Sequence, residues 1–354
     1  MVNRYNLFLW WVLLGLSLIG CKQNRVVEKA PFTIPVRDYR QSIVDIHDFT
    51  DTVEYLSIVS DSPMGSVIDY CLTDSTLIVL DTMQRVYLCS LQSGQVLRVM
   101  DKRGHGQGEY IEARAVFADL DRIYLLDFQG QSVLVYDRQF NYISRIKTEF
   151  PALDFAVVSD GYLFFNMNAS DELRQVVHTD YSGRVLDSFL SPGRKMDMLP
   201  DGRIFQEDGR GNVFITEPMS ETVYQWNGQS PRPVYTVDFG QKPASVSSNE
   251  EKYSRQSATV VRSIATADHV LTAFVSDGMM FFNVYESATN RVMSGLVNTH
   301  SELPFLPSSC SGGAMLGIYD TPWESVLKKD MEAKYPGSHV DKILVKYCLR
   351  TKNH

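Results

Sequence analysis

The chain alternates short apolar runs with polar turns at a regular spacing. The clearest unit lies in residues 101–148, where the runs 123–126 and 133–136 end at Asp127 and Asp137. Runs rich in Val, Ile, Leu and Tyr between tight turns are typical of strands in an antiparallel meander. A single meander buries too little surface to be stable alone, so the pattern predicts further copies.

Copies of this unit recur along the chain. Apolar runs that stop at a polar residue occur at 77–80, 123–126, 162–165, 203–205, 270–275 and 315–319. Six occurrences spaced by roughly 40 to 45 residues, with one longer gap, match the period of propeller blades. Runs this continuous are expected because blades pack face to face and bury both sides of their inner strands.

The two ends of the chain indicate how the ring closes. The last unit offers runs at 315–319 and 343–347 but no good outer strand, whereas the run 53–59 has no unit of its own. Pairing them removes an exposed edge. We therefore predict an all-β fold, a six-bladed β-propeller over residues 51–354 that is closed by an N-terminal strand. Patterns typical of helix starts at 247–251 and 321–324 predict short helical insertions.

Residues 1–21 have the features of a secretion signal. Arg4 precedes a largely apolar run at 7–18, which is shorter than the ~20 residues of a membrane span. Leu18-Ile19-Gly20-Cys21 then resembles a bacterial lipobox, in which the cysteine is acylated and becomes the N-terminus. The alternative is a signal anchor with an incidental cysteine. We predict lipid attachment at Cys21, followed by a tether and lead-in over residues 22–50.

The residues after Cys21 indicate the membrane. Lys22 stands where lipoproteins retained at the inner membrane often carry Asp, and the basic stretch 22–25 lacks the acidic cluster of surface-exported lipoproteins of Bacteroidota. We therefore expect an outer-membrane lipoprotein on the periplasmic face. The net charge of −8 and pI near 5.4 argue against nucleic-acid binding and broad adhesion to anionic lipid. Membrane contact is thus expected through the lipid anchor only.

Motifs for cofactors and catalysis are weak. The loop 104–108 reads Gly-His-Gly-Gln-Gly, whereas a dinucleotide fingerprint needs GxGxxG and further strand–helix alternation, so we expect no cofactor. The seven histidines show no HxH or HExxH spacing, and there is no GxSxG or P-loop, so we predict no metal site and no catalytic residue. Aspartates that end runs, at 81, 127 and 137, are interpreted as turn caps, and those at 119 and 121 as turn formers rather than calcium ligands.

Four cysteines remain after Cys21: Cys71, Cys89, Cys310 and Cys348. Cys71 and Cys89 are expected on the first and third strands of one blade, about 9.6 Å apart. Cys310 and Cys348 are expected at the equivalent places in the last blade. This separation exceeds the limit of about 7 Å between Cα atoms in a disulfide. We therefore predict four free thiols.

The unit around the Gly-rich loop carries a family resemblance. Residues 103–110 (RGHGQGEY), with 122–127 (RIYLLD) and 133–137 (VLVYD), resemble the six-bladed propeller lipoproteins of Bacteroidota, which are distantly similar to NHL-repeat propellers. The loop of that family commonly reads G-x-G-P-G-E-Y, and here Gln107 stands where Pro is usual. The family's biochemistry is largely unassigned, so the resemblance implies architecture rather than activity.

One loop concentrates candidate binding groups: Arg103, His105, Glu109, Tyr110 and Arg114. It is expected to join the outer strand of one blade to the inner strand of the next, on the face where the central channel opens. The arginines suit an acidic ligand, Tyr110 could stack on a sugar, and the glycines could leave amides exposed. The alternative is an internal strut in which Glu109 pairs with an arginine.

The pattern favours a non-enzymatic binding or scaffolding propeller whose partner is a glycan, a peptide or another envelope protein. The alternative is a carbohydrate-active enzyme, a lyase or glycosidase, with its site at the channel mouth. A carboxylate pair ~5 to 9.5 Å apart there would favour hydrolysis. A mouth lined by arginines and aromatic residues without such a pair would favour binding.

Overall fold

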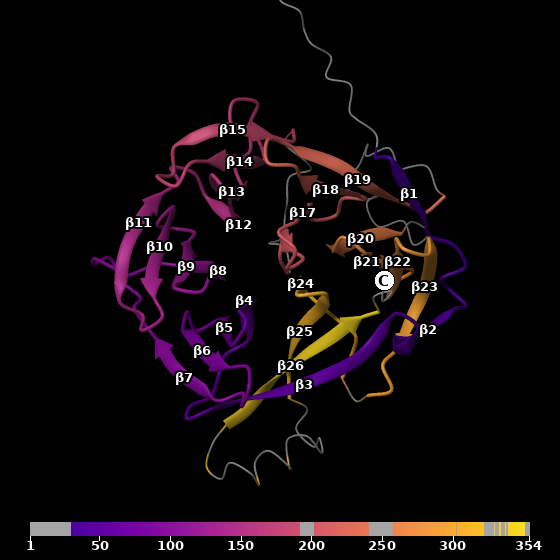
Figure 1. Ribbon diagram of the computed structural model, residues 1–354, viewed down its shortest axis with the longest axis horizontal. Coiled ribbons are helices and arrows are strands. Elements are labelled where there is room, and N and C mark those ends of the chain that lie inside the picture. Colours follow the sequence, from indigo (N-terminus) through magenta and orange to yellow (C-terminus); the bar gives the residue numbers. More distant parts are fainter. Residues whose placement is uncertain are drawn as a thin grey trace, which may run out of the picture.

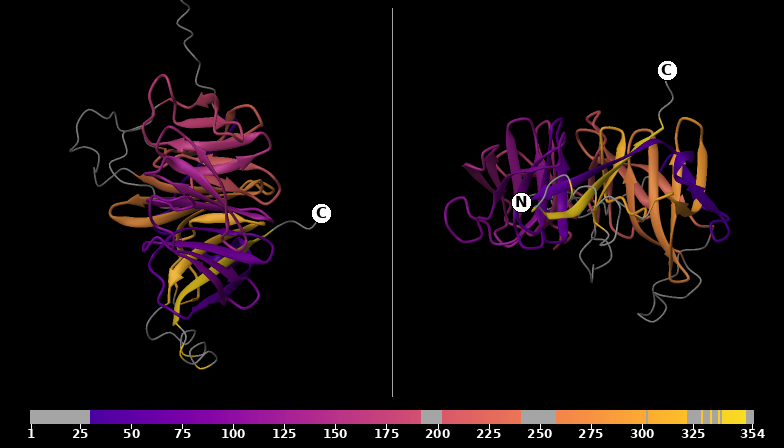
Figure 2. Two further views of the ribbon diagram at one scale, coloured as in Figure 1. Left: turned by 90° about the vertical axis from the view of Figure 1, so that its left-hand side faces the viewer. Right: turned by 90° about the horizontal axis from the view of Figure 1, so that it is seen from below.

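The computed structural model describes residues 30–191, 202–240, 258–301, 303–321 and 339–350, with Lys329, Ala333 and Gly337 between them. In these ranges, six sheets are arranged in a ring around a central axis (Figure 1), and from the side the ring is flat (Figure 2). The predicted six-bladed all-β propeller is confirmed.

The first three blades follow one another along the chain, each from its innermost strand outward. Blade 1 comprises β4 (Val67–Leu72), β5 (Thr76–Asp81), β6 (Val86–Ser90) and β7 (Val96–Met100). Blade 2 comprises β8 (Ala113–Ala118), β9 (Arg122–Asp127), β10 (Ser132–Asp137) and β11 (Tyr142–Lys147). Blade 3 comprises β12 (Ala152–Val158), β13 (Gly161–Asn166), β14 (Val176–Thr179) and β15 (Val185–Phe189).

The other three blades complete the ring. Blade 4 comprises β16 (Phe205–Glu207), β17 (Val213–Thr216), β18 (Thr222–Trp226) and β19 (Pro231–Asp238). Blade 5 comprises β20 (Thr259–Ala265), β21 (His269–Ser276), β22 (Met279–Glu286) and β23 (Arg291–Asn298). Blade 6 comprises β24 (Ser309–Ser311), β25 (Ala314–Asp320) and β26 (His339–Leu349), with its outer strand taken from the N-terminal part of the chain.

Residues 32–60, here called the strap, run along the outside of blades 4, 5 and 6 (indigo in Figure 1). β1 (Phe32–Pro35) pairs in parallel with β19, and β2 (Ile43–Asp45) pairs in parallel with β23. A short 3₁₀ turn (Ile46–Asp48) leads into β3 (Thr50–Ser60), which pairs antiparallel with β26 along most of its length. The predicted closure by the N-terminal strand is therefore confirmed.

The strap is part of the folded body rather than a tether. Ile34, Val36, Val44 and Ile46 are at most 5% exposed. Within the predicted tether and lead-in over 22–50, the chain therefore already packs on the propeller from Phe32 onward. Residues 1–29, with the predicted signal and Cys21, lie outside the described part of the chain.

One assignment of a run to a strand was wrong. The sequence pattern makes the run 203–205 the counterpart of 77–80 and 123–126, which form second strands. It instead leads into β16, the innermost strand of blade 4, and β17 is the second strand. β16 spans only three residues, so its apolar run resembles the run of a second strand such as β17. The predicted helix at 247–251 lies outside the described residues, as does nearly all of the one at 321–324.

The core consists of apolar layers between consecutive blades. Ile78 and Leu80 of blade 1, for example, belong to one buried cluster with Val116 and Leu125 of blade 2. Because every blade is covered on both faces, its middle strands are largely apolar, as the continuous runs predicted. No helix in the described part of the chain is long and apolar enough to span a membrane.

The four cysteines sit where strand counting placed them. Cys71 and Cys89 lie on β4 and β6, and Cys310 and Cys348 lie on β24 and β26. All four are free thiols. Burial raises the pKa of Cys71 to about 11 and that of Cys89 to about 12, so both stay protonated at neutral pH.

Candidate functional site

Two adjoining cavities occupy the centre of the ring, where the inner strands begin. Cavity 1, of about 190 Å³, lies toward blades 5 and 6, and cavity 2, of about 240 Å³, lies toward blades 2 and 3. They share one wall, formed by Val67, Ile68, Asp69, Gly202 and Arg203. The site is therefore built by residues from all six blades.

β-Bulges aim side chains into this centre. The inner strands of blades 1, 2, 3 and 5 each show a register shift near their start. In blade 2 the extra residue is Arg114, which lies between the paired residues Ala113 and Ala115. An unpaired residue in a bulge can turn its side chain away from the alternation of the strand. Arg114 accordingly lines cavity 2.

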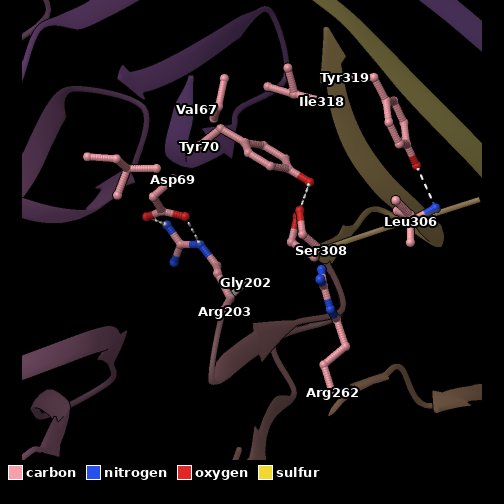
Figure 3. Close-up of a pocket in the computed structure, with 12 residues that line it drawn as sticks. Val67, Asp69, Tyr70, Gly202, Arg203, Arg262, Leu306, Ser308, Ile318 and Tyr319 are labelled. Carbon is pink, nitrogen blue, oxygen red and sulfur yellow. Dashed lines mark hydrogen bonds and ion pairs between the residues drawn. The ribbon is translucent and has the colours of Figure 1, made fainter. Parts of the chain in front are cut away.

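Arg203 connects blades across the centre (Figure 3). It lies just before β16 of blade 4, and its Nε and Nη2 donate to the two oxygens of Asp69 on blade 1, at 3.2 and 2.9 Å. Nη2 also donates to the carbonyl of Val116 on blade 2, and Nη1 lies 4.0 Å from Asp154 on blade 3. Its side chain is 12% exposed. A single guanidinium thus contacts three other blades.

The two carboxylates beside Arg203 are already hydrogen bonded. Asp69 Oδ2 accepts from the Val116 amide at 2.7 Å. Asp154 accepts from the amides of Ile204 and Phe205 through one oxygen and from that of Phe155 through the other, at 2.7 to 3.0 Å. These bonds fix both groups as joints between blades, since the donors to Asp69 and to one oxygen of Asp154 belong to other blades.

Burial shifts the titration of these carboxyls. It raises the pKa of Asp69 to about 6, against the opposing effect of Arg203, and it also raises the pKa of Asp154. Glu207, on β16, has its pKa raised by burial to about 7. The centre of the ring therefore holds acids that change protonation near neutral pH.

Arg114 differs from Arg203 in its partners. Its Nε is buried and has no hydrogen-bond partner among the described residues. A buried, unpaired donor is costly, and it is satisfied when a ligand supplies an acceptor. Arg114 therefore combines an unpaired donor with a side chain that borders cavity 2.

Cavity 1 is more mixed in character. Leu306 and Ile318 form part of its wall, and Arg262 donates to the carbonyl of Pro307 at 3.0 Å. The hydroxyls of Tyr70 and Tyr319 also border it, but both are hydrogen bonded within the protein, to Ser308 and to the Leu306 amide among others (Figure 3).

The loop predicted as the binding site is split by the fold. As expected, it joins β7 to β8. Arg103 and His105 are exposed on the loop, whereas Arg114 lies at the centre of the ring. Glu109 accepts a hydrogen bond from the Gly106 amide at 2.8 Å, and its backbone carbonyl accepts one from Arg145. The residues predicted together are therefore not brought together as one site.

Two expectations about this loop need correction. Tyr110 is fully buried, with its hydroxyl donating to the Gln84 carbonyl, so it offers no face to a sugar. Gly108 alone of the three glycines has a positive φ, of 73°. Gly104 and Gly106 instead make room for the carboxylate of Glu109, since an added Cβ would lie 2.1 and 3.0 Å from its oxygens or carboxyl carbon. The loop wraps its own glutamate rather than presenting amides outward.

The aspartates interpreted as turn caps have that role. Asp127 is fully buried and accepts from the amides of Ile111, Glu112 and Gly130. Asp119 accepts from the amides of Asp121 and Arg122 and from the hydroxyl of Tyr124. No cluster of side chains suited to a metal ion occurs among the described residues.

Sequence reasoning missed Asp69, Asp154, Arg203 and Arg262. Apart from Arg203, they lie on the innermost strands, whose first residues show no apolar run to mark them. Their repeat spacing carried a weak signal, because Asp69, Arg114 and Asp154 recur at blade intervals. The signal is weak because the positions differ by one in register: Asp69 pairs with β5, whereas Arg114 is the unpaired residue of its bulge.

The fold and its charged centre define a class of protein, a six-bladed propeller with a polar site at its axis. The chain belongs to the family described as Domain of unknown function (DUF4934), which matches residues 32–345. No curated protein sequence matches it.

Two solved structures from Bacteroides are similar in fold. One, a protein of Bacteroides fragilis NCTC 9343 that carries the description of an exported protein, is 16% identical with a TM-score of 0.70, covering 91% of this chain and 100% of that one. The other, a member of the DUF4221 family from Bacteroides vulgatus ATCC 8482, is 7% identical with a TM-score of 0.50, covering 86% and 98%. At these identities the likeness extends to the fold.

Proposed function

We propose that the protein is a non-enzymatic binding propeller that takes an acidic group of its ligand into cavity 2. The observation that carries the proposal is Arg114, whose buried Nε has no partner among the described residues and whose side chain lines that cavity. A carboxylate or sulfate would accept from this guanidinium in a charge-assisted hydrogen bond. The ligand is then an acidic glycan, an acidic peptide or an acidic segment of an envelope protein.

The hydrogen bonding at the centre favours binding over hydrolysis. Besides a carboxyl that gives a proton, a glycosidase needs a second carboxylate that is free to attack or to activate water. At the centre of the ring that second group would be Asp154, and both of its oxygens are held by backbone amides. The enzymatic alternative would have to free Asp154 from this joint between blades, at the expense of the fold.

We further propose an envelope location. The apolar run at 7–18 and the Gly20-Cys21 junction support export and lipid attachment at Cys21, on the periplasmic face of an outer membrane. The description of the similar B. fragilis protein as exported agrees with this. We also propose a distant relation to NHL-repeat propellers, which the sequence of the unit around Asp127 supports.

Binding to purified protein tests the site. Thermal-shift screening would use sulfate, uronate-containing and sulfated oligosaccharides, and acidic peptides, with neutral oligosaccharides as controls. For a ligand that stabilises the wild type, Arg114→Gln should weaken binding by about 1.5 to 3 kcal/mol, or roughly 10- to 150-fold. The melting temperature without ligand should change little, because this substitution breaks no hydrogen bond to Nε.

Arg103→Gln is the matched control. It removes an equal charge from the exposed loop that leads to the same strand. Equal weakening by both substitutions would indicate nonspecific attraction to positive charge. No stabilisation by any acidic compound would contradict the proposal.

A further inference from the structure

The charges around cavity 2 balance before any ligand binds. Arg114 and Arg203 contribute two positive charges, and Asp69 and Asp154 contribute two negative ones. An anion beside Arg114 adds a negative charge near two buried carboxylates. Charges interact strongly where water is largely excluded, so this addition is opposed unless one carboxylate is neutralised.

Resting on the proposed function, we propose that an anion bound beside Arg114 is accompanied by a proton, and that Asp69 takes up this proton. The site would then hold a ligand anion and a neutral carboxylic acid side by side. The proton adds to one Asp69 oxygen, and the O–H can donate to the anion, since Asp69 lines the same cavity. Asp69 becomes the residue that sets the specificity of the site for an acceptor-rich anion.

Asp69 is better placed for this role than Asp154. All the amide bonds to Asp154 favour its charged form, and they occupy both of its oxygens. Asp69 accepts from two amides, those of Val116 and Tyr70, and its Oδ1 receives Arg203 Nε at the longer distance of 3.2 Å. A proton on Oδ1 therefore opposes fewer amide hydrogen bonds than a proton on Asp154. When Asp69 is protonated, Arg203 still has two acceptors within reach, the carbonyl of Val116 and the carboxylate of Asp154.

The surrounding groups leave Asp69 and Glu207 as the candidates. Charged or titratable side chains near Asp69 come from every adjoining element: Arg203, Asp154, Arg114, Arg262, Glu207, Cys71, Tyr70 and Tyr319. Burial raises the pKa of Cys71 to about 11 and also raises those of both tyrosines, so these remain neutral between pH 5 and 8. Burial brings the pKa of Asp69 to about 6 and that of Glu207 to about 7.

Calorimetry with sulfate measures whether the protein takes up a proton when it binds the anion. Sulfate stays fully ionised between pH 5 and 8, so any proton taken up on binding goes to the protein. Titrating the wild type in cationic buffers of different ionisation enthalpy should show uptake of about one proton at pH 7.5. The dissociation constant should rise by up to about tenfold per pH unit above pH 6 and level off below it.

Two variants assign the proton. Asp69→Asn should bind sulfate with little pH dependence and without proton uptake, and Glu207→Gln should keep both. The reverse pattern, or sulfate binding to the wild type with no proton uptake at any pH, would overturn the role of Asp69 and leave the anion site standing. Absence of sulfate binding at every pH would overturn the inference, and failure of every other acidic compound to bind would overturn the proposed function as well. The wild-type measurement decides even if Asp69→Asn fails to fold.

Discussion

Arg203 is the residue on which the centre of the ring depends. Its guanidinium contacts Asp69, Asp154 and the carbonyl of Val116 and is mostly shielded from water. Removing one partner of a buried ion pair leaves the other charge without compensation. The contacts join four blades, so their loss affects the ring rather than one sheet.

We expect Arg203→Met to lower the free energy of unfolding by about 3 to 5 kcal/mol, because Asp69 and Asp154 would stay buried without the guanidinium that they contact. Urea denaturation measures this change. Arg184→Met is the control, since Arg184 is 77% exposed and pairs with Asp180 in a surface turn, where such pairs contribute ~1 kcal/mol or less. Equal losses would show that Arg203 is not a joint between blades.

At the residue scale, sequence reasoning named one residue of the candidate site. Arg114 was among the predicted binding residues and lines cavity 2, whereas Tyr110 proved to be core. Asp69 and Arg203 lie 134 positions apart, and nothing local to either indicates that they meet. Contacts of this kind form only when the blades assemble into a ring, so local sequence patterns cannot predict them.

The strap is the element with the largest consequence for the fold. Three consecutive blades receive an outer strand from it, and β3 also contacts blade 1 through the Val59 amide and the Gly94 carbonyl. Its strands β1 and β2 escaped prediction because they span four and three residues and alternate buried with exposed positions. The longer β3 was predicted, since its apolar run is marked and its pairing completes the last blade.

The strap offers a matched pair of substitutions. Ile34 is fully buried between blades, and Ile43 on the next strand is 72% exposed. Ile34→Ala should cost about 2 to 5 kcal/mol of stability through lost burial and the cavity left behind. Ile43→Ala should stay within about 0.5 kcal/mol. Denaturation curves that shift equally would mean that the strap is only loosely attached.

Closure of the ring gives a separate prediction. Deleting residues 51–60 removes β3 and leaves β26 with an unpaired edge along most of its length. The product should aggregate or elute as large species in size-exclusion chromatography. A soluble monomer with one cooperative melting transition would contradict the closure by β3.

For the whole molecule, carboxyls with raised pKa values favour stability on the acidic side of neutral pH. Burial raises the pKa of Asp69 to about 6 and those of Glu207 and Glu217 to about 7. A carboxyl with a raised pKa in the folded state favours folding when it is protonated, so this stability is lost as the pH rises through 6 to 7. Other carboxyls act oppositely: hydrogen bonds from Asn141 lower the pKa of Asp137, and that stability is lost below about pH 4.

The protein should therefore melt at a higher temperature at pH 5 than at pH 8, by on the order of 2 to 5 °C. Glu217→Gln should reduce the difference, because a neutral amide replaces one of the titrating groups. Glu221→Gln, at an exposed position nearby, should leave it unchanged. Scanning calorimetry of the three proteins at both pH values makes the comparison. A wild type that melts at a higher temperature at pH 8 than at pH 5 would contradict this prediction.

The repeat count, the ring and its closure followed from sequence because each depends on apolar periodicity that every blade repeats. The charged centre did not, since six blades contribute one or a few residues each to it, from strands with weak patterns. The fold is thus predicted from the apolar runs of each unit, whereas the candidate site is formed by charged residues outside those runs. The central claim, that the axis of the ring binds an anion at Arg114, is accessible to direct observation.

Crystals of the protein soaked in selenate and measured at the selenium absorption edge test it most directly. The anomalous map should show a tetrahedral anion in cavity 2, with an oxygen about 2.7 to 3.2 Å from Arg114 Nε, and this peak should be missing from crystals of Arg114→Gln. Selenate found at exposed residues such as Arg103 or Arg184, with cavity 2 empty of it in the wild type, would contradict the claim.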